Sequence, residues 1–214
     1  MKKETFTETL MNEIKAQSGK TLKNFPHKDL PIISFKSKES VDRYARKCPA
    51  WVAPGGKFEH TNFFMAIENY KHRPRIVEAE VSPCYVRDTD TIFMPSVEPF
   101  YGKHSYYGVL FHELIHSTGL SNRLSRNSLT RPENPVVFTR PSNDHAYEQI
   151  VAESGAAYVV NTLAKLTSYR ALYVARYISS YAKLVSMPET ILRESLADAR
   201  AAASYVLNGI TVPE

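Results

Sequence analysis

The stretch that most constrains the fold is an apolar and aromatic run that contains His112, Glu113 and His116 and ends at Gly119. Residues four apart lie on one face of an α-helix, one turn from each other. Both imidazoles can therefore bind one metal ion with Glu113 beside it, as in the HExxH pattern of zinc hydrolases. A surface pair of histidines is the alternative, and the apolar residues on both sides argue against it. We expect a helix over residues 105–118 that binds one Zn²⁺, with Glu113 as the catalytic base.

Composition and length favour one domain with its own core, because 43% of the 214 residues are hydrophobic and 23% are charged. No apolar run approaches the roughly 18 residues that span a bilayer, so we expect no membrane partner. The first ten residues lack the apolar stretch of a secretory signal. Cys48 and Cys84 have the wrong spacing for a Cys-type zinc site. We expect both as reduced thiols in a cytoplasmic protein.

Charge is distributed unevenly along the chain. Residues 1–75 contain 15 Lys and Arg against 8 Asp and Glu, whereas residues 76–214 contain 12 against 14. A basic front on a near-neutral body favours contact with a polyanion, here single-stranded or duplex DNA. A solvated lysine-rich surface is the alternative, since the basic clusters are short and match no nucleic-acid motif. We divide the chain into a basic N-terminal helix and arm over 1–39 and a zincin-like main domain over 40–214.

Periodicity predicts an α+β fold in which a small antiparallel sheet packs on a mostly helical body. Besides the motif helix, apolar residues recur at helical spacing in segments 5–17, 40–47, 63–70, 142–166, 168–184 and 188–207. Strand-like composition marks residues 32–35, 76–81, 84–86 and 91–94, of which the last three form the expected sheet. Ser40 is a suitable N-cap for the helix that follows it, and Ser142–Asp144 offers cap residues for the long helix.

Catalytic zinc needs three protein ligands and an open position, so the motif requires a third side chain. In one large group of zinc proteases the motif continues to a later histidine, but Asn122 occupies that position and a neutral amide is a poor ligand. Met187 alone is weak evidence for the methionine turn of that group. Glu153 is the only charged residue of the run 150–164, and a buried carboxylate is costly unless it is paired or binds a metal. We therefore predict Glu153 as the third ligand; the alternative is a glutamate on a solvent-facing edge of the helix.

Other polar residues have less specific roles. Glu148 lies near the start of the same helix, where its carboxylate interacts favourably with the helix dipole or orients a ligand histidine. His145 competes as a third ligand, although a histidine at the start of a helix is more often a surface residue. Asp144 is a further candidate for orienting a histidine. Hydrolysis also needs a group that stabilises the oxyanion, and the candidates are Tyr106, Tyr107, Tyr147, His145 and Arg123.

A resemblance to a known family rests on five stretches, which are residues 85–95, 106–119, 123–126, 147–157 and 176–205. They resemble the zincin-like metallopeptidase domain of ArdC-type anti-restriction proteins of plasmids and phages, and more distantly the ImmA/IrrE peptidases. The resemblance implies a gluzincin-type HExxH…E site in which His112, His116 and Glu153 bind the metal. Two features depart from the family. Leu120 stands where a further histidine is frequent, and the first 70 residues do not resemble the usual single-stranded-DNA-binding domain.

These observations predict a zinc metallopeptidase that cleaves an intracellular protein. In one version of the hypothesis, that substrate protein is associated with DNA. The source of the peptidase would be a plasmid, a phage or a bacterial host. Glu113 would take a proton from the attacking water and pass it to the leaving amine. The alternative is a catalytically weak zincin-fold module that binds DNA or acts in anti-restriction or regulation. A toxin domain that cleaves a host factor shares the sequence features of the first hypothesis.

Overall fold

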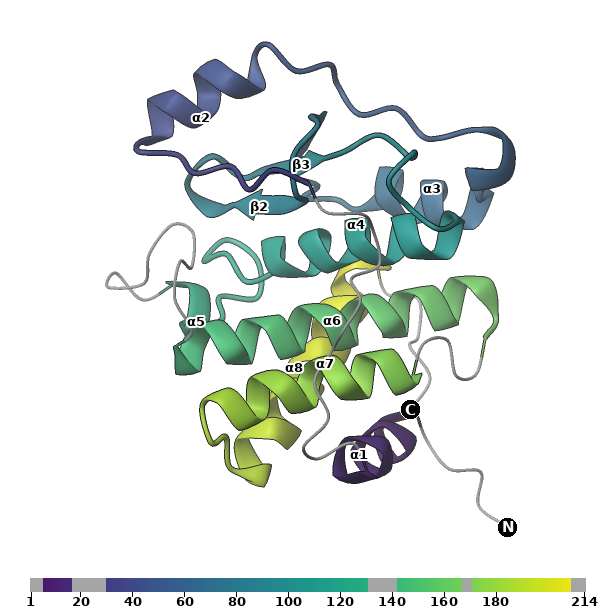
Figure 1. Cartoon of the computed structure of the whole chain (residues 1–214), viewed down its shortest axis with the longest axis vertical. Helices are drawn as coiled ribbons and strands as arrows, with labels where there is room; N and C mark the ends of the chain where they lie inside the picture. The colour runs from purple at the N-terminus through teal and green to yellow at the C-terminus, as the bar shows by residue number, and fades with distance from the viewer. Residues whose placement is uncertain (1–5, 17–29, 131–141, 167–170, 209–214) are drawn as a thin grey trace.

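The computed structural model describes residues 6–16, 30–130, 142–166 and 171–208. Its helices are α1 (Phe6–Ala16), α2 (Lys38–Ala45), α3 (Thr61–Asn69), α4 (Lys103–Ser117), α5 (Asn127–Thr130), α6 (Asn143–Ala164), α7 (Ala171–Leu184) and α8 (Glu189–Val206). Its strands are β1 (Arg75–Glu78), β2 (Cys84–Val86) and β3 (Thr91–Met94), and two 3-10 turns are η1 (Gly56–Phe58) and η2 (Arg87–Thr89). In Figure 1 the sheet and α2 form one end, α4 crosses next to the sheet, and α6, α7 and α1 follow in turn. The predicted α+β class is confirmed.

The sheet is mixed, with the strand order β1-β3-β2. The predicted antiparallel pairing holds between β2 and β3, whereas β1 runs parallel to β3, with Arg75 opposite Thr91. The hairpin between β2 and β3 is tight, and Asp90 adopts φ 46° at its end. That hairpin returns β3 to the position next to β1, which gives the two strands the same direction. The antiparallel prediction was therefore wrong for this pair.

Residues 32–35 form no strand, contrary to the prediction. This segment is fixed by other contacts. The amide of Ser82 donates to the carbonyl of Pro31 (2.8 Å), and the ring of Phe35 stacks on Phe93 with centroids 5.3 Å apart. The β-favouring composition of the segment is thus explained by packing on the sheet and not by strand pairing.

Helix α2 begins before Ser40, because Ser37 is the N-cap. The Ser40 amide donates to the Ser37 hydroxyl (3.3 Å) and the Ser37 amide donates to the Ser40 hydroxyl (3.1 Å), so the two residues form a capping box. The long helix α6 is capped by Ser142, as predicted, and its hydroxyl accepts from the amide of His145 (3.0 Å). In both cases a hydroxyl satisfies an amide that the first turn leaves unpaired.

Helix α4 lies in the centre of the main core, and ten of its 15 residues are buried. Its aromatic and aliphatic side chains pack against the sheet and α3 on one side and against α6 and α8 on the other. A helix that is apolar on most of its circumference is stable only when it is covered from several sides. The HExxH motif is therefore held on a buried helix.

The close approach of α6 to α4 depends on Gly155. A Cβ atom at this position would lie 2.9 Å from the Cγ2 atom of Ile115. The missing side chain lets the backbone of α6 approach the motif helix, and this approach brings the polar residues of α6 to the histidines.

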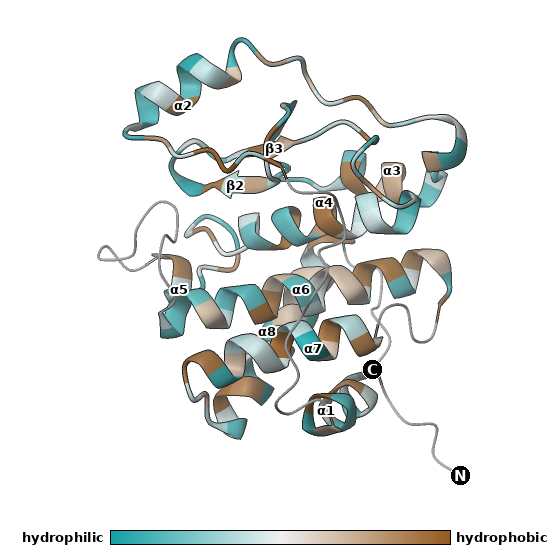
Figure 2. Ribbon diagram, in the orientation of Figure 1, coloured by the Kyte–Doolittle hydropathy of each residue, from teal (hydrophilic) through white to brown (hydrophobic). Residues whose placement is uncertain are grey.

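Two smaller cores complete the structure. Leu10 and Ile14 of α1 pack with Ile178 of α7 and with residues of α6 and α8. On the face of the sheet opposite α4, α2 packs against the strands through Val41 and Ala45. The rest of α2 is mostly hydrophilic (Figure 2). Among the described residues, no helix combines the length and the apolar character that a membrane crossing requires.

Candidate metal centre

The motif helix brings two histidine side chains to one point. His112, Glu113 and His116 are all buried, and the Nε2 atoms of the two histidines lie 3.2 Å apart. Two nitrogens bound to one tetrahedral Zn²⁺ at the usual distance lie about 3.3 Å from each other. The two imidazoles therefore already have the spacing that a shared ion requires.

The outer nitrogen of each ring faces a carboxylate of α6. Nδ1 of His112 lies 3.1 Å from Oε2 of Glu153, and Nδ1 of His116 lies 3.5 Å from Oε2 of Glu148. An ionised carboxylate only accepts hydrogen bonds, so it favours the tautomer with hydrogen on Nδ1. The Nε2 lone pairs are then left to face each other, which is the arrangement that metal-binding histidines have in proteins.

The two histidines differ in basicity. Burial lowers the pKa of His116, and the hydrogen bond that its imidazole donates to Glu148 only partly opposes this. Burial also disfavours the charged form of His112, but the hydrogen bond to Glu153 and the charge of Glu113 outweigh it and raise the pKa of that imidazole. His112 is thus the ring that holds a proton more readily, and a metal ion has to compete with that proton.

Glu153 lies beside the two histidines but does not point to the same centre. Its carboxylate contacts the outer nitrogen of His112, and 14% of its side chain is exposed. Among the residues that the structure describes, no three His, Cys, Asp or Glu side chains are grouped as a metal site. The donor set that converges here is two imidazoles, and the ligand role of Glu153 stays a prediction.

Glu148 is the most deeply buried ionisable residue of the site, with 0% exposure. Burial opposes its ionisation, but the guanidinium of Arg126 more than compensates and lowers the pKa of Glu148 to about 2. Arg126 donates from Nε to Oε1 (2.8 Å) and from Nη2 to Oε2 (2.9 Å), and the hydroxyl of Ser128 donates to Oε1 as well. A paired carboxylate therefore stands behind His116, where it is placed to orient the imidazole.

Two residues at the site escaped the sequence analysis. Nε2 of Gln149 lies 3.4 Å from Nε2 of His116, and the Tyr177 hydroxyl donates to Oε1 of Gln149. The ring centroid of Tyr177 lies 6.1 Å from that of His112. Gln149 precedes Glu153 by one turn on α6, so helical spacing alone marks it as a neighbour of the site. No local pattern marks Tyr177, which comes from the next helix.

A family model for zincin-like metallopeptidases, MPTase-PolyVal, matches residues 66–195, which is more than half of the chain and includes the motif, Gln149 and Glu153. The chain belongs to this family. The match covers the sheet, α4 and α6, and so includes both helices that carry the histidines and their carboxylate partners.

The solved structures similar to the chain include two of the antirestriction protein ArdC from plasmid R388. The Mn(II)-bound structure is 24% identical with a TM-score of 0.50, and the match covers 74% of this chain and 54% of that one. The metal-free structure is 19% identical with a TM-score of 0.47, over 96% of this chain and 76% of that one. The chain thus matches about half the length of the Mn(II)-bound protein, and a likeness at this identity shows the fold alone. No curated protein matches the chain.

Within this zincin-like fold, most of the proposed transition-state residues are bound elsewhere. Arg123 pairs with Asp90, and the ring of Tyr107 packs on that of Phe63 in the core. Tyr106 accepts a hydrogen bond from Trp51 (2.7 Å), and Tyr147 donates to Asp198 (2.8 Å). The ring of His145 lies against Tyr181, with centroids 5.7 Å apart. Each of these contacts is made with a residue other than His112 and His116.

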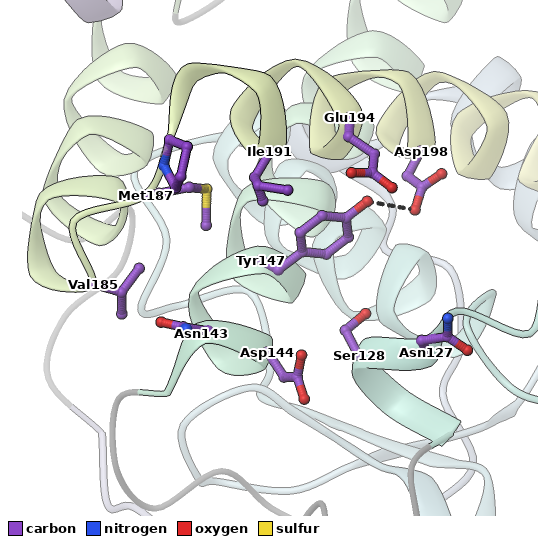
Figure 3. A pocket seen from close by; sticks show the side chains of 11 residues that line it. Asn127, Ser128, Asn143, Asp144, Tyr147, Val185, Met187, Ile191, Glu194 and Asp198 are labelled. Carbon is purple, nitrogen blue, oxygen red and sulfur yellow. Dashed lines mark hydrogen bonds between the residues drawn. The ribbon is translucent and has the colours of Figure 1, made fainter.

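Asp144 and Tyr147 line a separate pocket of about 410 Å³ between the start of α6, α5 and α8 (Figure 3). Glu194 and Asp198 of α8 face it from the opposite wall. The pocket meets the network of the metal centre at Ser128, which lines it and donates to Glu148. Glu148 and Glu153 lie next to the outer nitrogens of the two histidines, and the orienting role of Asp144 stays a prediction.

Proposed function

We propose that the chain is a zinc-dependent metallopeptidase that cleaves peptide bonds in a protein substrate. His112 and His116 would hold the metal together with Glu153, and Glu113 would be the general base. The observation that supports this most strongly is the 3.2 Å separation of the two Nε2 atoms, each on a ring whose outer nitrogen faces a carboxylate. This arrangement fits a divalent cation, because a positive centre relieves two lone pairs that face each other.

Bound zinc would supply Lewis acidity toward the carbonyl of the scissile bond and toward the attacking water. Glu113 follows His112 directly on α4, and its buried carboxylate would take the proton from that water. The same carboxylate would then deliver the proton to the leaving amine. Hydrolysis thus needs from Glu113 only the ability to hold one proton between two steps.

Strand β2 is placed to bind a substrate next to this carboxylate. It is one of the two edge strands in the order β1-β3-β2, and its first residue, Cys84, lies near Glu113. Burial and then the charge of Glu113 raise the pKa of the Cys84 thiol to about 12. An extended peptide adds readily to an exposed sheet edge through main-chain hydrogen bonds. We propose that the substrate runs along β2 with its scissile bond near Glu113.

The test is the variant Glu113→Gln beside Glu68→Gln, an exposed glutamate of α3 that pairs with Arg73. Each purified protein is loaded with zinc, and its metal content and its cleavage of labelled casein and of a fluorogenic peptide mixture are measured. We expect Glu113→Gln to bind about one zinc per chain and to lose cleavage, and Glu68→Gln to match the wild type. Equal cleavage by Glu113→Gln would refute the assignment.

A second proposal is contact with DNA, which also fits a catalytically weak anti-restriction module like the one the ArdC name describes. Exposed basic residues on and next to α2 favour it, namely Lys36, Lys38, Arg43, Arg46 and Lys47. Binding through phosphates releases counterions, so the DNA affinity would fall steeply as salt rises. We expect that slope to decrease in a variant with Arg43, Arg46 and Lys47 changed to Gln. A flat salt dependence in the wild type argues for a peptidase that does not bind DNA.

A further inference from the structure

The side-chain amide of Gln149 faces the point at which the two ligand histidines converge. Its Nε2 lies 3.4 Å from Nε2 of His116. An amide nitrogen only donates hydrogen bonds, so the acceptor in this contact is the lone pair of His116. The amide hydrogens therefore face the point where the two imidazoles converge, and under the proposed function the scissile carbonyl would bind next to that point.

Tyr177 fixes this orientation from the other side. Its hydroxyl donates to Oε1 of Gln149, and a carbonyl oxygen that is already bound in this way cannot turn toward the histidines without losing the contact. Tyr177 is buried in the contact between α7 and α6, and burial and the neighbouring Tyr181 raise its pKa well above the ordinary value. The hydroxyl consequently remains protonated and continues to donate.

Two of the other donors considered for the oxyanion, and Tyr177 itself, are already bound to other groups. The hydroxyl of Tyr147 donates to Asp198, and the guanidinium of Arg123 is bound to Asp90 and to the carbonyl of Ser117. The hydroxyl of Tyr177 is used by Gln149 itself. Of the neutral donors described around the two histidines, the amide of Gln149 is the one directed at them.

We propose that Gln149 stabilises the oxyanion of peptide hydrolysis and that Tyr177 is the positioning residue that holds its amide. This role rests on the proposed function. As the water oxygen bonds to the carbonyl carbon, Glu113 takes the water proton and the carbonyl π pair moves onto oxygen. The Gln149 amide donates to that oxygen. The electron pair on that oxygen then re-forms the carbonyl bond, the C–N bond breaks, and the leaving nitrogen takes the proton from Glu113. A donor that is in place before charge develops strengthens its bond in the transition state.

The experiment compares Gln149→Ala, Gln149→Glu, Tyr177→Phe and the double variant Gln149→Ala/Tyr177→Phe. Gln149→Glu keeps the shape and the acceptor for Tyr177 but removes the donor, so it covers the case in which Gln149→Ala fails to fold. Tyr158→Phe is the matched control, because it removes another buried tyrosine hydroxyl, which is 2.6 Å from that of Thr7. Three quantities are measured: zinc content, kcat and KM on a fluorogenic peptide that the wild type cleaves, and Kd for a phosphonamidate dipeptide, whose tetrahedral oxygens resemble the oxyanion.

Removing one preorganised oxyanion donor lowers kcat by about 100-fold, and this is the loss we expect for both Gln149 variants, with little change in KM. Tyr177→Phe should lose about 10-fold, the scale of an outer partner that orients a functional group. The double variant should be no slower than Gln149→Ala, because Tyr177 acts through Gln149. The affinity for the phosphonamidate should fall in the same order while zinc content stays constant. Tyr158→Phe should resemble the wild type.

Three results would overturn the proposal. Gln149 variants that bind zinc and keep kcat and phosphonamidate affinity would exclude the donor role. Loss of zinc in both Gln149 variants would show that the amide acts on the metal site and not on the oxyanion. Multiplicative losses in the double variant would exclude positioning by Tyr177. Failure of the proposed function would give a different result, because the zinc-loaded wild type would then neither cleave peptides nor bind the phosphonamidate. The role of Gln149 would then be refuted as well.

Discussion

Replacing Arg126 by Met should destabilise the protein more than any exposed charge substitution, because it leaves the carboxylate of Glu148 buried without its cation. Arg126 is 6% exposed and Glu148 is 0% exposed, and the two form a two-pronged pair at 2.8 and 2.9 Å. The guanidinium also donates to Thr118 (2.6 Å) and to the carbonyl of Ile115 (3.0 Å) at the end of α4. One substitution therefore breaks the link between α4, α5 and α6.

Two independent considerations give the magnitude. Removing one partner of a buried ion pair costs about 3–5 kcal/mol, since the remaining charge is unpaired in a poor solvent for charge. The pKa of Glu148 is lowered from 4.5 to about 2, and a difference of this size corresponds to about 3 kcal/mol of stabilisation at neutral pH. We expect Arg126→Met to lose about 3–5 kcal/mol of the free energy of unfolding near pH 7.

The dependence on pH has a definite sign. In the wild type the folded-state pKa of Glu148 lies below 4.5, so its contribution is complete above about pH 4.5 and is lost as the pH falls toward 2. Without Arg126, burial raises the pKa of Glu148 above its ordinary value. The folded variant then takes up a proton at a pH where the unfolded chain does not. The stability deficit of Arg126→Met should therefore shrink between pH 7 and pH 5.

Urea unfolding of the metal-free protein, followed by far-UV circular dichroism at both pH values, measures these differences. Arg193→Met is the matched control, because Arg193 forms an exposed pair with Glu189 one turn away on α8, and such pairs contribute about 0.3–0.5 kcal/mol. The double variant Arg126→Met/Glu148→Met should recover most of the loss, since no unpaired charge remains. A deficit below about 1 kcal/mol at pH 7, or one that is the same at pH 5, would refute this account of the buried pair.

Two further substitutions test the site and its packing. Glu153→Ala should weaken zinc binding by at least about 10-fold in competition with a chelator, whether Glu153 binds the metal or orients His112, and an unchanged affinity would exclude both roles. Gly155→Ala should lower the free energy of unfolding by about 1–3 kcal/mol, because the new Cβ would lie 2.9 Å from Ile115. Thermal unfolding measures this loss, and Gly155→Ala combined with Ile115→Val should recover part of it.

The helices of this fold other than the short α5 were predictable because each carries its signal locally. The apolar run around the motif implied a covered helix, and α4 is covered on both sides. Pairing between strands depends on segments far apart in the chain, and there the prediction failed: the direction of β1 follows from where the hairpin of β2 and β3 places β3. The segment 32–35 shows a related limit, since side chains that favour strands pack equally well on the face of a sheet.

The candidate site likewise contains residues that the sequence predicts and residues that it does not. The spacing of His112 and His116 is a property of one helix, and the structure shows their nitrogens converging as that spacing implies. Arg126 lies in a polar stretch that also contains other arginines, and nothing in the stretch itself indicates that this arginine is buried. Its burial follows from Glu148, which is inaccessible to solvent and requires a cation. Tyr177 is likewise explained only by its partner on another helix.

The polar side chains of α6 show how site residues without a local motif can still be predicted from the sequence. Glu148, Gln149 and Glu153 lie on a helix whose middle is mostly buried and apolar, and each contacts a histidine of α4. A buried polar group is costly unless it is paired. Three of them within six residues of one covered helix therefore imply a polar partner on the element that covers it. The only neighbouring helix of comparable burial with histidines on its surface is α4 among the described residues. A search for polar residues in the apolar part of a helix would therefore have predicted Gln149 as a site residue together with the two carboxylates.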